Sequence, residues 1–304
     1  MKRNLFLVII AAFVIMTSCS YEGQQEPVIP DTPTTDTVET ISIDVPSNVT
    51  IDGQTMTMDE YIAGVVAAEL QGWFHPETFR VFAIAARTNA VKQINSGKEL
   101  INSTSFQCFY SKEKLKEIYG DKFEGYYQKF LYAATSTNNM VIVDESGKLI
   151  DAMYHALSSG KTEESRFVTG YEVSYLKSVP SPWDTECLDY ENVRVISYEK
   201  LKSLGFDKPK FEVISYSDTG NPYMYEVCGM ELTATEIMYK LGLKSAVFEV
   251  QYSSHGIEFT TYGFGHGLGI SSYGAEGMAK EGYTYIEIIS HYYTGVRVVR
   301  YQKL

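Results

Sequence analysis

One carboxylate stands where the sequence pattern calls for an apolar side chain. Ile62, Val65 and Val66 fall on one stripe at helical period, and Glu69 takes the next position on that stripe. Burying a carboxylate is costly unless it is protonated, paired or hydrogen-bonded, so Glu69 is a candidate general acid whose pKa burial would raise. Alternatively, the helix ends near Gly72 and Glu69 turns toward water. Periodicity alone favours this second interpretation.

Two histidines are the next candidates for chemistry. His155 lies near the end of a predicted strand and precedes Gly160-Lys161-Thr162, which resembles the end of a phosphate-binding loop. That interpretation is rejected because the expected first glycine is absent and no helix pattern follows. His266 lies in a loop with glycine at alternate positions, but without the dinucleotide-binding spacing. It either contacts substrate in a glycine-framed cleft or is hydrogen-bonded inside a tight loop.

A predicted helical hairpin positions Glu69. Thr57 and Glu60 have the spacing of a capping box, so the first helix should begin near Met58. The second should begin at Pro76 and end at Gly97. Because the connection is short, we expect antiparallel packing that could bring Arg87 within reach of Glu69. The alternative for Arg87 is a solvent-facing position.

The remaining pattern mixes strands and helices. We expect a first strand near 41–44, helix over 113–135, a hairpin of 140–144 with 148–156, and loops over 171–222. Further along we expect a helix capped by Thr233 and Glu236 and ended by Gly242, a hairpin of 247–252 with 257–262, and a last strand over 296–301. This predicts an α+β fold. A helical hairpin packs against antiparallel sheets, with a cleft between the helical and strand-rich parts.

Composition is that of a globular protein with a substantial core. The chain has 304 residues, of which 44% are hydrophobic and 21% charged, and a formal net charge of -12. This acidic balance argues against a nucleic-acid partner, because phosphate binding needs clustered Lys and Arg. The 24 tyrosines could stack on sugar faces, although packing is the default.

The N-terminus predicts export. Lys2 and Arg3 precede an apolar run over 5–16, too short to span a bilayer, and small residues then lead to Cys19. This resembles a bacterial lipobox, although Met16 replaces the usual Leu. We therefore predict a lipoprotein signal peptide over 1–19, lipidation of Cys19, and a disordered Pro- and Thr-rich tether over 20–40. The alternative is an ordinary cleaved signal in which Cys19 is incidental.

The other cysteines are Cys108, Cys187 and Cys228, widely spaced and without a CxxC pair. Their odd number leaves at least one free thiol in an exported protein. A disulfide between Cys187 and Cys228 is compatible with the sequence.

Six blocks of the sequence stand out when they are taken together. In chain order they are Val65-Val66-Ala67-Ala68-Glu69, Ala83-Ile84-Ala85-Ala86-Arg87-Thr88, Tyr154-His155-Ala156-Leu157-Ser158-Ser159-Gly160-Lys161-Thr162, Tyr175-Leu176-Lys177-Ser178-Val179, Gly265-His266-Gly267-Leu268-Gly269 through Tyr273-Gly274-Ala275, and His291-Tyr292-Tyr293 with Gly295. These blocks, in this order, resemble the SpoIID/LytB domain, named for stage II sporulation protein D and the amidase enhancer LytB. The resemblance covers about 41–304, which we assign as one catalytic domain.

The resemblance implies a peptidoglycan lytic transglycosylase that prefers glycan stripped of stem peptides. Glu69 matches the catalytic glutamate, and Arg87 and His155 match residues required around it. One carboxyl group suffices, because the C6 hydroxyl of N-acetylmuramic acid closes a 1,6-anhydro ring and no water needs activation. Supporting or substrate-binding roles fall on Ser158, Ser159, Lys161, His266, Ser271 and Tyr273.

Three departures from the family pattern affect the expected site. Leu70-Gln71 follows Glu69 where Met-Pro is common, and Ser272 stands where Gln is frequent. Ser158 replaces the cysteine through which some members bind zinc, so we expect no metal and no cofactor.

The expected partners are peptidoglycan strands, a cell-wall amidase, and the membrane through the lipid anchor. Two alternatives to an enzyme remain: a glycan-binding enhancer of an N-acetylmuramoyl-L-alanine amidase, and an envelope lipoprotein that only binds glycan.

Overall fold

The computed structural model describes residues 39–43 and 45–303, so the predicted signal peptide, Cys19 and nearly all of the tether lie outside the described residues. The chain forms two compact units. The first contains the residues up to Met153 together with Met278–Ser290 and those from Gly295 on, and the second contains Tyr154–Gly277 and His291–Thr294. Across the described ranges, no helix is both long and apolar enough to cross a membrane.

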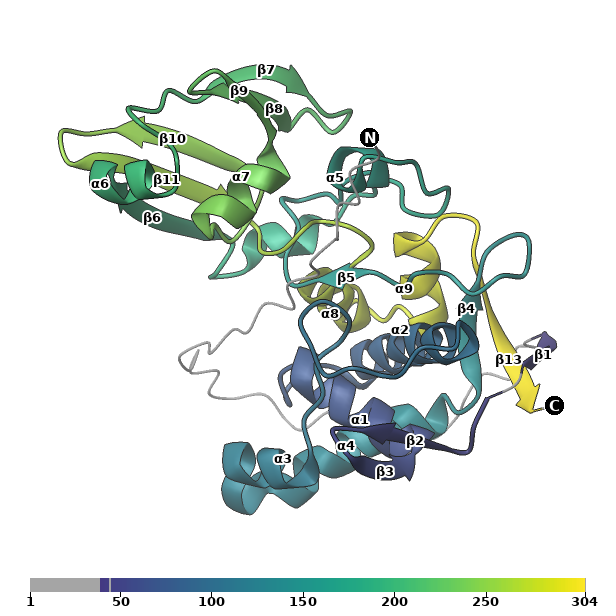
Figure 1. Ribbon diagram of the computed structural model, residues 1–304. Helices are drawn as coiled ribbons and strands as arrows, with labels where there is room; N and C mark the ends of the chain where they lie inside the picture. The colour runs from purple at the N-terminus through teal and green to yellow at the C-terminus, as the bar shows by residue number, and fades with distance from the viewer. Residues whose placement is uncertain (1–38, 44, 304) are drawn as a thin grey trace. The chain divides into compact units, whose positions relative to one another are not determined.

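The first unit is built on four helices. The predicted hairpin is confirmed as α1 (Met58–Glu69) and α2 (Pro76–Asn95), and the capping box of Thr57 and Glu60 is formed as expected. The helical stretch predicted over 113–135 divides into α3 (Lys112–Tyr119) and α4 (Phe123–Ser136), joined by a short 3-10 turn. Helices α1, α2 and α4 contact one another pairwise, as Figure 1 shows. Their shared apolar faces form the core that fixes the ends of α1.

Helix α2 also packs against a mixed sheet, where antiparallel sheets were predicted. Strand β13 (Arg297–Lys303) pairs in parallel with β1 (Thr40–Ile43) and antiparallel with β4 (Met140–Val143). The predicted partner strand over 148–156 is largely irregular. It keeps two bonds to the free edge of β4, from the Asp144 N–H to the Lys148 carbonyl and from the Ile150 N–H to the Ile142 carbonyl, but the Ile142 N–H donates to the Thr88 hydroxyl instead. The turn itself is correct, with Asp144 accepting from the amides of Ser146 and Lys148. A separate hairpin joins β2 (Asn48–Ile51) to β3 (Gln54–Thr57).

The second unit carries most of the strands. An antiparallel sheet joins β6 (Glu191–Ser197), β11 (Gly256–Tyr262) and β10 (Phe248–Tyr252), and another joins β7 (Glu212–Tyr216), β8 (Pro222–Val227) and β9 (Met230–Thr233). A shared apolar core includes Leu201 of α6 (Tyr198–Ser203) and Ile237 of α7 (Ala234–Leu241). The prediction of loops over 171–222 is thus wrong for β6, α6 and β7. Most residues of these elements are exposed, so the sequence shows no clear alternation of apolar and polar positions there.

Short elements complete the second unit. The two-residue strands β5 (Tyr154–His155) and β12 (Ile270–Ser271) pair in parallel, and α5 (Ser165–Thr169) and the 3-10 turn η2 (Pro182–Glu186) lie between β5 and β6 in sequence. Helices α8 (Ser272–Lys280) and α9 (Tyr285–Tyr292) contribute residues to both units.

The α+β class is confirmed, whereas the cleft and the single domain over 41–304 stay predictions. The Cys187–Cys228 disulfide with which the sequence is compatible is not formed, since Cys108, Cys187 and Cys228 are free thiols.

Candidate functional site

Glu69 is the last residue of α1, where the helix meets its connection to α2. The side chain is half-buried, so the carboxylate keeps contact with solvent. Its Oε1 accepts a hydrogen bond of 3.2 Å from the backbone N–H of Cys108. The helix does end here, as the second interpretation has it, and yet the carboxylate is held rather than turned freely toward water, while the role of Glu69 as a general acid stays a prediction.

A segment remote in sequence holds that carboxylate. Residues 107–110 lie against α1, with the Tyr110 N–H donating to the Gly64 carbonyl at 3.1 Å and the Gln107 amide donating to the Tyr61 hydroxyl at 2.8 Å. A Cβ on Gly64 would come within 2.3 Å of the Phe109 ring. Only glycine therefore allows this approach. Sequence reasoning missed the segment, although a glycine inside an apolar helix, which costs stability, was an available signal.

The negative charge of Glu69 acts on its neighbours. Burial and then the charge of Glu69 raise the pKa of the Cys108 thiol to about 11. Burial, with smaller effects of Cys108 and Glu69, also raises the pKa of Tyr110. Both groups are therefore neutral at pH 7, and in this state they can act only as neutral hydrogen-bonding groups beside the carboxylate.

Arg87 does not pair with Glu69 as the sequence suggested it could. Its Nη2 lies 3.2 Å from the Asp59 carboxylate and 2.7 Å from the Ala134 carbonyl, and its Nη1 donates to the Thr137 and Met140 carbonyls. The reason is register. Arg87 is the twelfth residue of α2, and the twelfth residue counted back from the end of α1 is Met58. An antiparallel hairpin therefore places Arg87 opposite the start of α1, about 15 Å along the helix from Glu69.

The burial of Arg87 defines what it can do. The side chain is 0% exposed, so it is not the solvent-facing residue of the alternative interpretation. Its guanidinium satisfies carbonyls at the C-terminal end of α4, which would otherwise lack partners. It thus ties α1, α2 and α4 together as a positioning residue.

In the second unit, the structure brings His155 and His266 together. Strand β5 pairs with β12, and a Cβ on Gly265 would meet the His155 Cβ at 2.9 Å, so the glycine permits this close approach. The two imidazole centroids are 5.8 Å apart. His155 is 6% exposed and His266 5%.

One residue sets the protonation pattern of both rings. The Leu268 carbonyl can only accept, so His155 Nδ1, at 3.1 Å, carries its hydrogen. The Leu268 N–H donates to His266 Nδ1 at 3.0 Å, so in the neutral ring the hydrogen of His266 lies on Nε2. Burial, assisted by repulsion from His266, lowers the pKa of His155 to about 3, and burial lowers that of His266 to about 4. Both rings are neutral at pH 7.

Asp184 is a buried hub that sequence reasoning missed. Its carboxylate accepts from the Ser158 N–H at 2.9 Å, the Ser158 hydroxyl at 2.6 Å and the Ser271 hydroxyl at 2.7 Å. Burial raises its pKa, and these hydrogen bonds oppose the shift. Ser158 and Ser271 are buried with it, and their hydroxyls hold two loops in place. The two prolines of the segment Pro180–Asp184 were the available signal in the sequence.

Three other predicted residues are accessible. Ser159 Oγ accepts from Asn221, the exposed Lys161 donates to the Thr219 carbonyl, and the half-buried Tyr273 donates its N–H to the Ala156 carbonyl at 3.3 Å. Their side chains are better placed than Ser158 or Ser271 to meet a ligand.

No group of three or more His, Cys, Asp or Glu that could hold an ion occurs in the described part of the chain. Ser158 is engaged with Asp184.

Comparisons with known proteins agree with this arrangement. The family described as "Stage II sporulation protein", SpoIID, matches residues 49–143, which include Glu69 and Arg87. The chain is 34% identical over 259 residues to the stage II sporulation protein D of Bacillus subtilis (strain 168), covering 81% of this chain and 75% of that one. The chain belongs to the SpoIID family.

Other relatives extend that result. This SpoIID family member is 32% identical over 258 residues to the stage II sporulation protein D of Bacillus amyloliquefaciens, with the same coverage of 81% and 75%. It is 22% identical over 306 residues to the amidase enhancer of Bacillus subtilis (strain 168), covering 79% of this chain and 40% of that protein.

Proposed function

We propose that this SpoIID family member is an exported, lipid-anchored peptidoglycan lytic transglycosylase. It would cleave the β-1,4 bond between N-acetylmuramic acid and N-acetylglucosamine on glycan poor in stem peptides. The observation that carries the proposal is Glu69, a half-buried carboxylate at the end of α1, held by the Cys108 N–H and still open to solvent. Its place in the family's motif supports the same role.

The chemistry uses one carboxyl group twice. Glu69 first donates its proton to the glycosidic oxygen, and the bond from C1 of N-acetylmuramic acid to that oxygen breaks. The C6 hydroxyl oxygen then bonds to C1, and its proton returns to the Glu69 carboxylate. The product carries a 1,6-anhydro ring, and Glu69 ends in the protonated state in which it began.

Other residues would support this step without taking part in proton transfer. The Cys108 N–H orients one carboxylate oxygen, and Arg87 fixes the helix that carries Glu69. Ser159, Lys161 and Tyr273 are candidates for glycan contacts. His155, His266, Ser158 and Ser271 would shape the loops around them.

The test is Glu69→Gln, which keeps the size and the acceptor oxygen but removes the titratable proton. Release of anhydro ends from purified peptidoglycan should fall by about 10²–10⁴-fold, the usual contribution of general acid–base catalysis. Glu99→Gln, at an exposed position, is the matched control and should retain full activity. Unchanged product from Glu69→Gln would remove the catalytic assignment.

The similarity to an amidase enhancer favours a second candidate, a glycan-binding protein that stimulates an amidase without cutting glycan. Incubation with peptidoglycan, with and without an N-acetylmuramoyl-L-alanine amidase, separates the two. Anhydro ends formed without the amidase support the enzyme. Stimulated amidase activity without anhydro ends supports the enhancer.

A further inference from the structure

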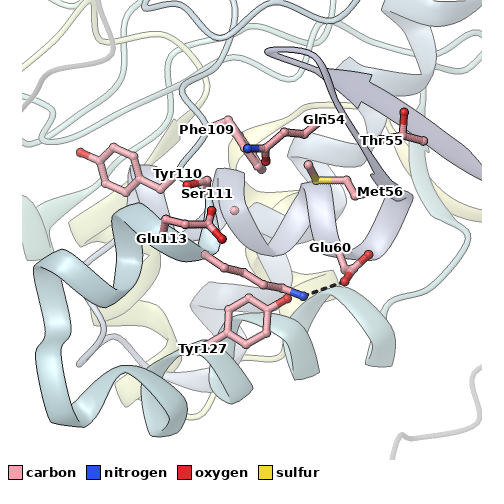
Figure 2. Close-up of a pocket in the computed structure, with 11 residues that line it drawn as sticks. Gln54, Thr55, Met56, Glu60, Phe109, Tyr110, Ser111, Glu113 and Tyr127 are labelled. Atoms are coloured by element: carbon pink, nitrogen blue, oxygen red, sulfur yellow. Dashed lines mark hydrogen bonds and ion pairs between the residues drawn. The ribbon is translucent and has the colours of Figure 1, made fainter.

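A pocket of about 200 Å³ opens beside the segment that holds Glu69. It is lined by β3, α1, α4 and residues 109–113, and it shares Gly64, Phe109 and Tyr110 with the contact between that segment and α1. Figure 2 shows Gln54, Glu60, Glu113 and Tyr127 gathered around it from four different elements. The pocket lies within the first unit and adjoins the Glu69 segment through continuous chain.

The charged groups of the pocket select against an anionic ligand. Glu60 and Lys112 form an ion pair of 2.8 Å, which lowers the pKa of Glu60 and raises that of Lys112, so both are charged at neutral pH. Glu113 adds a second carboxylate. Two carboxylates against one ammonium leave the lining with a net negative charge, which repels an anion. Carboxylates only accept and an ammonium only donates, so groups that do both, such as sugar hydroxyls, match the lining.

Tyr127 provides a more specific signal. Its side chain is 7% exposed, and its hydroxyl makes no hydrogen bond of full geometry within the described residues, where the Lys112 ammonium, already paired with Glu60, lies beside it. A buried hydroxyl that is so weakly partnered costs free energy, and a ligand group that bonds to it recovers that cost. Among the aromatic rings of the lining, Tyr110 is half-buried and offers an apolar surface beside which a sugar ring can lie, whereas Phe109 and Tyr127 are buried.

We propose that this pocket is a saccharide subsite that binds one N-acetylhexosamine ring of the glycan strand. Drug-sized ligands occupy pockets of about 300–1,000 Å³, so the smaller volume here suits a single ring. The subsite rests on the proposed function, because residues 108–110 run from Glu69 into the pocket and would place the bound ring in the strand that Glu69 acts on.

The experiment measures binding separately from cleavage. In the Glu69→Gln background, calorimetry with N-acetylchitotetraose gives the reference affinity. Tyr127→Phe removes only the hydroxyl and should weaken binding about fivefold, the effect of one neutral hydrogen bond. Gln54→Ala, at an exposed position, tests the opposite wall and should also weaken binding. Tyr132→Phe, on α4 but outside the pocket lining, is the control and should bind normally.

The outcomes separate this inference from the proposed function. No binding of the tetramer, or equal affinity in Tyr127→Phe, Gln54→Ala and the control, overturns the subsite even if wild-type protein releases anhydro ends. If both pocket variants lose affinity while wild-type protein releases no anhydro ends, the subsite stands and the proposed catalysis fails.

Discussion

The two ends of the α1–α2 hairpin use charged residues in opposite ways. At the start of α1, Arg87 is fully buried and donates hydrogen bonds to Asp59 and to a carbonyl at the end of α4. At the other end, Glu69 is half-buried and its carboxylate accepts a hydrogen bond from the backbone N–H of Cys108. Both residues lie in the span that matches the family. The comparison teaches that one helical hairpin can combine a half-buried carboxylate at one end with a buried arginine that holds its helices at the other.

The largest loss of stability should follow from removing the buried charge of Arg87. Arg87→Met preserves bulk but leaves Asp59 and carbonyls of α4 without their partner, so the free energy of unfolding should fall by about 3–5 kcal/mol. Urea unfolding measures it. The control is Lys92→Met, on the same helix as Arg87. It removes a surface ion pair with Asp151 and should lower the free energy of unfolding by under about 1 kcal/mol. Normal stability of Arg87→Met with lost activity would instead place Arg87 in the reaction itself.

The buried histidines of the second unit predict a pH dependence of stability. Their folded pKa values, about 3 for His155 and about 4 for His266, lie below the unfolded value near 6.5. The unfolded chain therefore binds more protons below pH 6.5, and stability is lost as pH falls from there toward 4. Each histidine should cost about 2 kcal/mol at pH 5.

Urea unfolding between pH 7 and pH 5 checks this expectation. His266→Gln should have a shallower pH dependence than wild-type protein, because one of the two titrations is removed. The exposed His255→Gln is the control and should keep the wild-type slope. An identical slope in His266→Gln would mean that this ring is not held neutral by burial.

A smaller loss of stability is expected from Gly64→Ala, which tests how the Glu69 carboxylate is held. In Gly64→Ala the new methyl group would lie 2.3 Å from the Phe109 ring, so residues 107–110 must move and the Cys108 N–H shifts from Glu69. Overpacking should cost about 1–3 kcal/mol. The rate of anhydro-end release should fall further, by about 10²-fold, because misplacing a catalytic group is costly.

The control for that variant is Gly125→Ala, since a Cβ at Gly125 meets nothing within 4 Å. Replacing a helical glycine with alanine should leave activity unchanged and slightly raise stability. If Gly64→Ala kept full activity, the 107–110 segment would have no part in positioning Glu69.

Local signals in the sequence determined much of the fold. The capping boxes at Thr57 and Thr233, Pro76 at the start of α2 and the glycines around His266 act through neighbouring backbone groups, so they could be interpreted without a structure. The position of Glu69 on the apolar stripe marked it as unusual for the same reason. Family motifs then supplied a role that periodicity alone did not.

Contacts between distant residues were decided only by the tertiary structure. The partner of Arg87 depends on the register of a helical hairpin, and the holder of Glu69 is an amide about forty residues away in the chain, at Cys108. Likewise, the role of Asp184 as a hydrogen-bond acceptor is evident only when the fold brings the Ser158 and Ser271 hydroxyls to it. Sequence spacing encodes local geometry, whereas these contacts follow from packing that brings separate segments together. The sequence thus marked Glu69 as exceptional, and the fold decided which groups surround it.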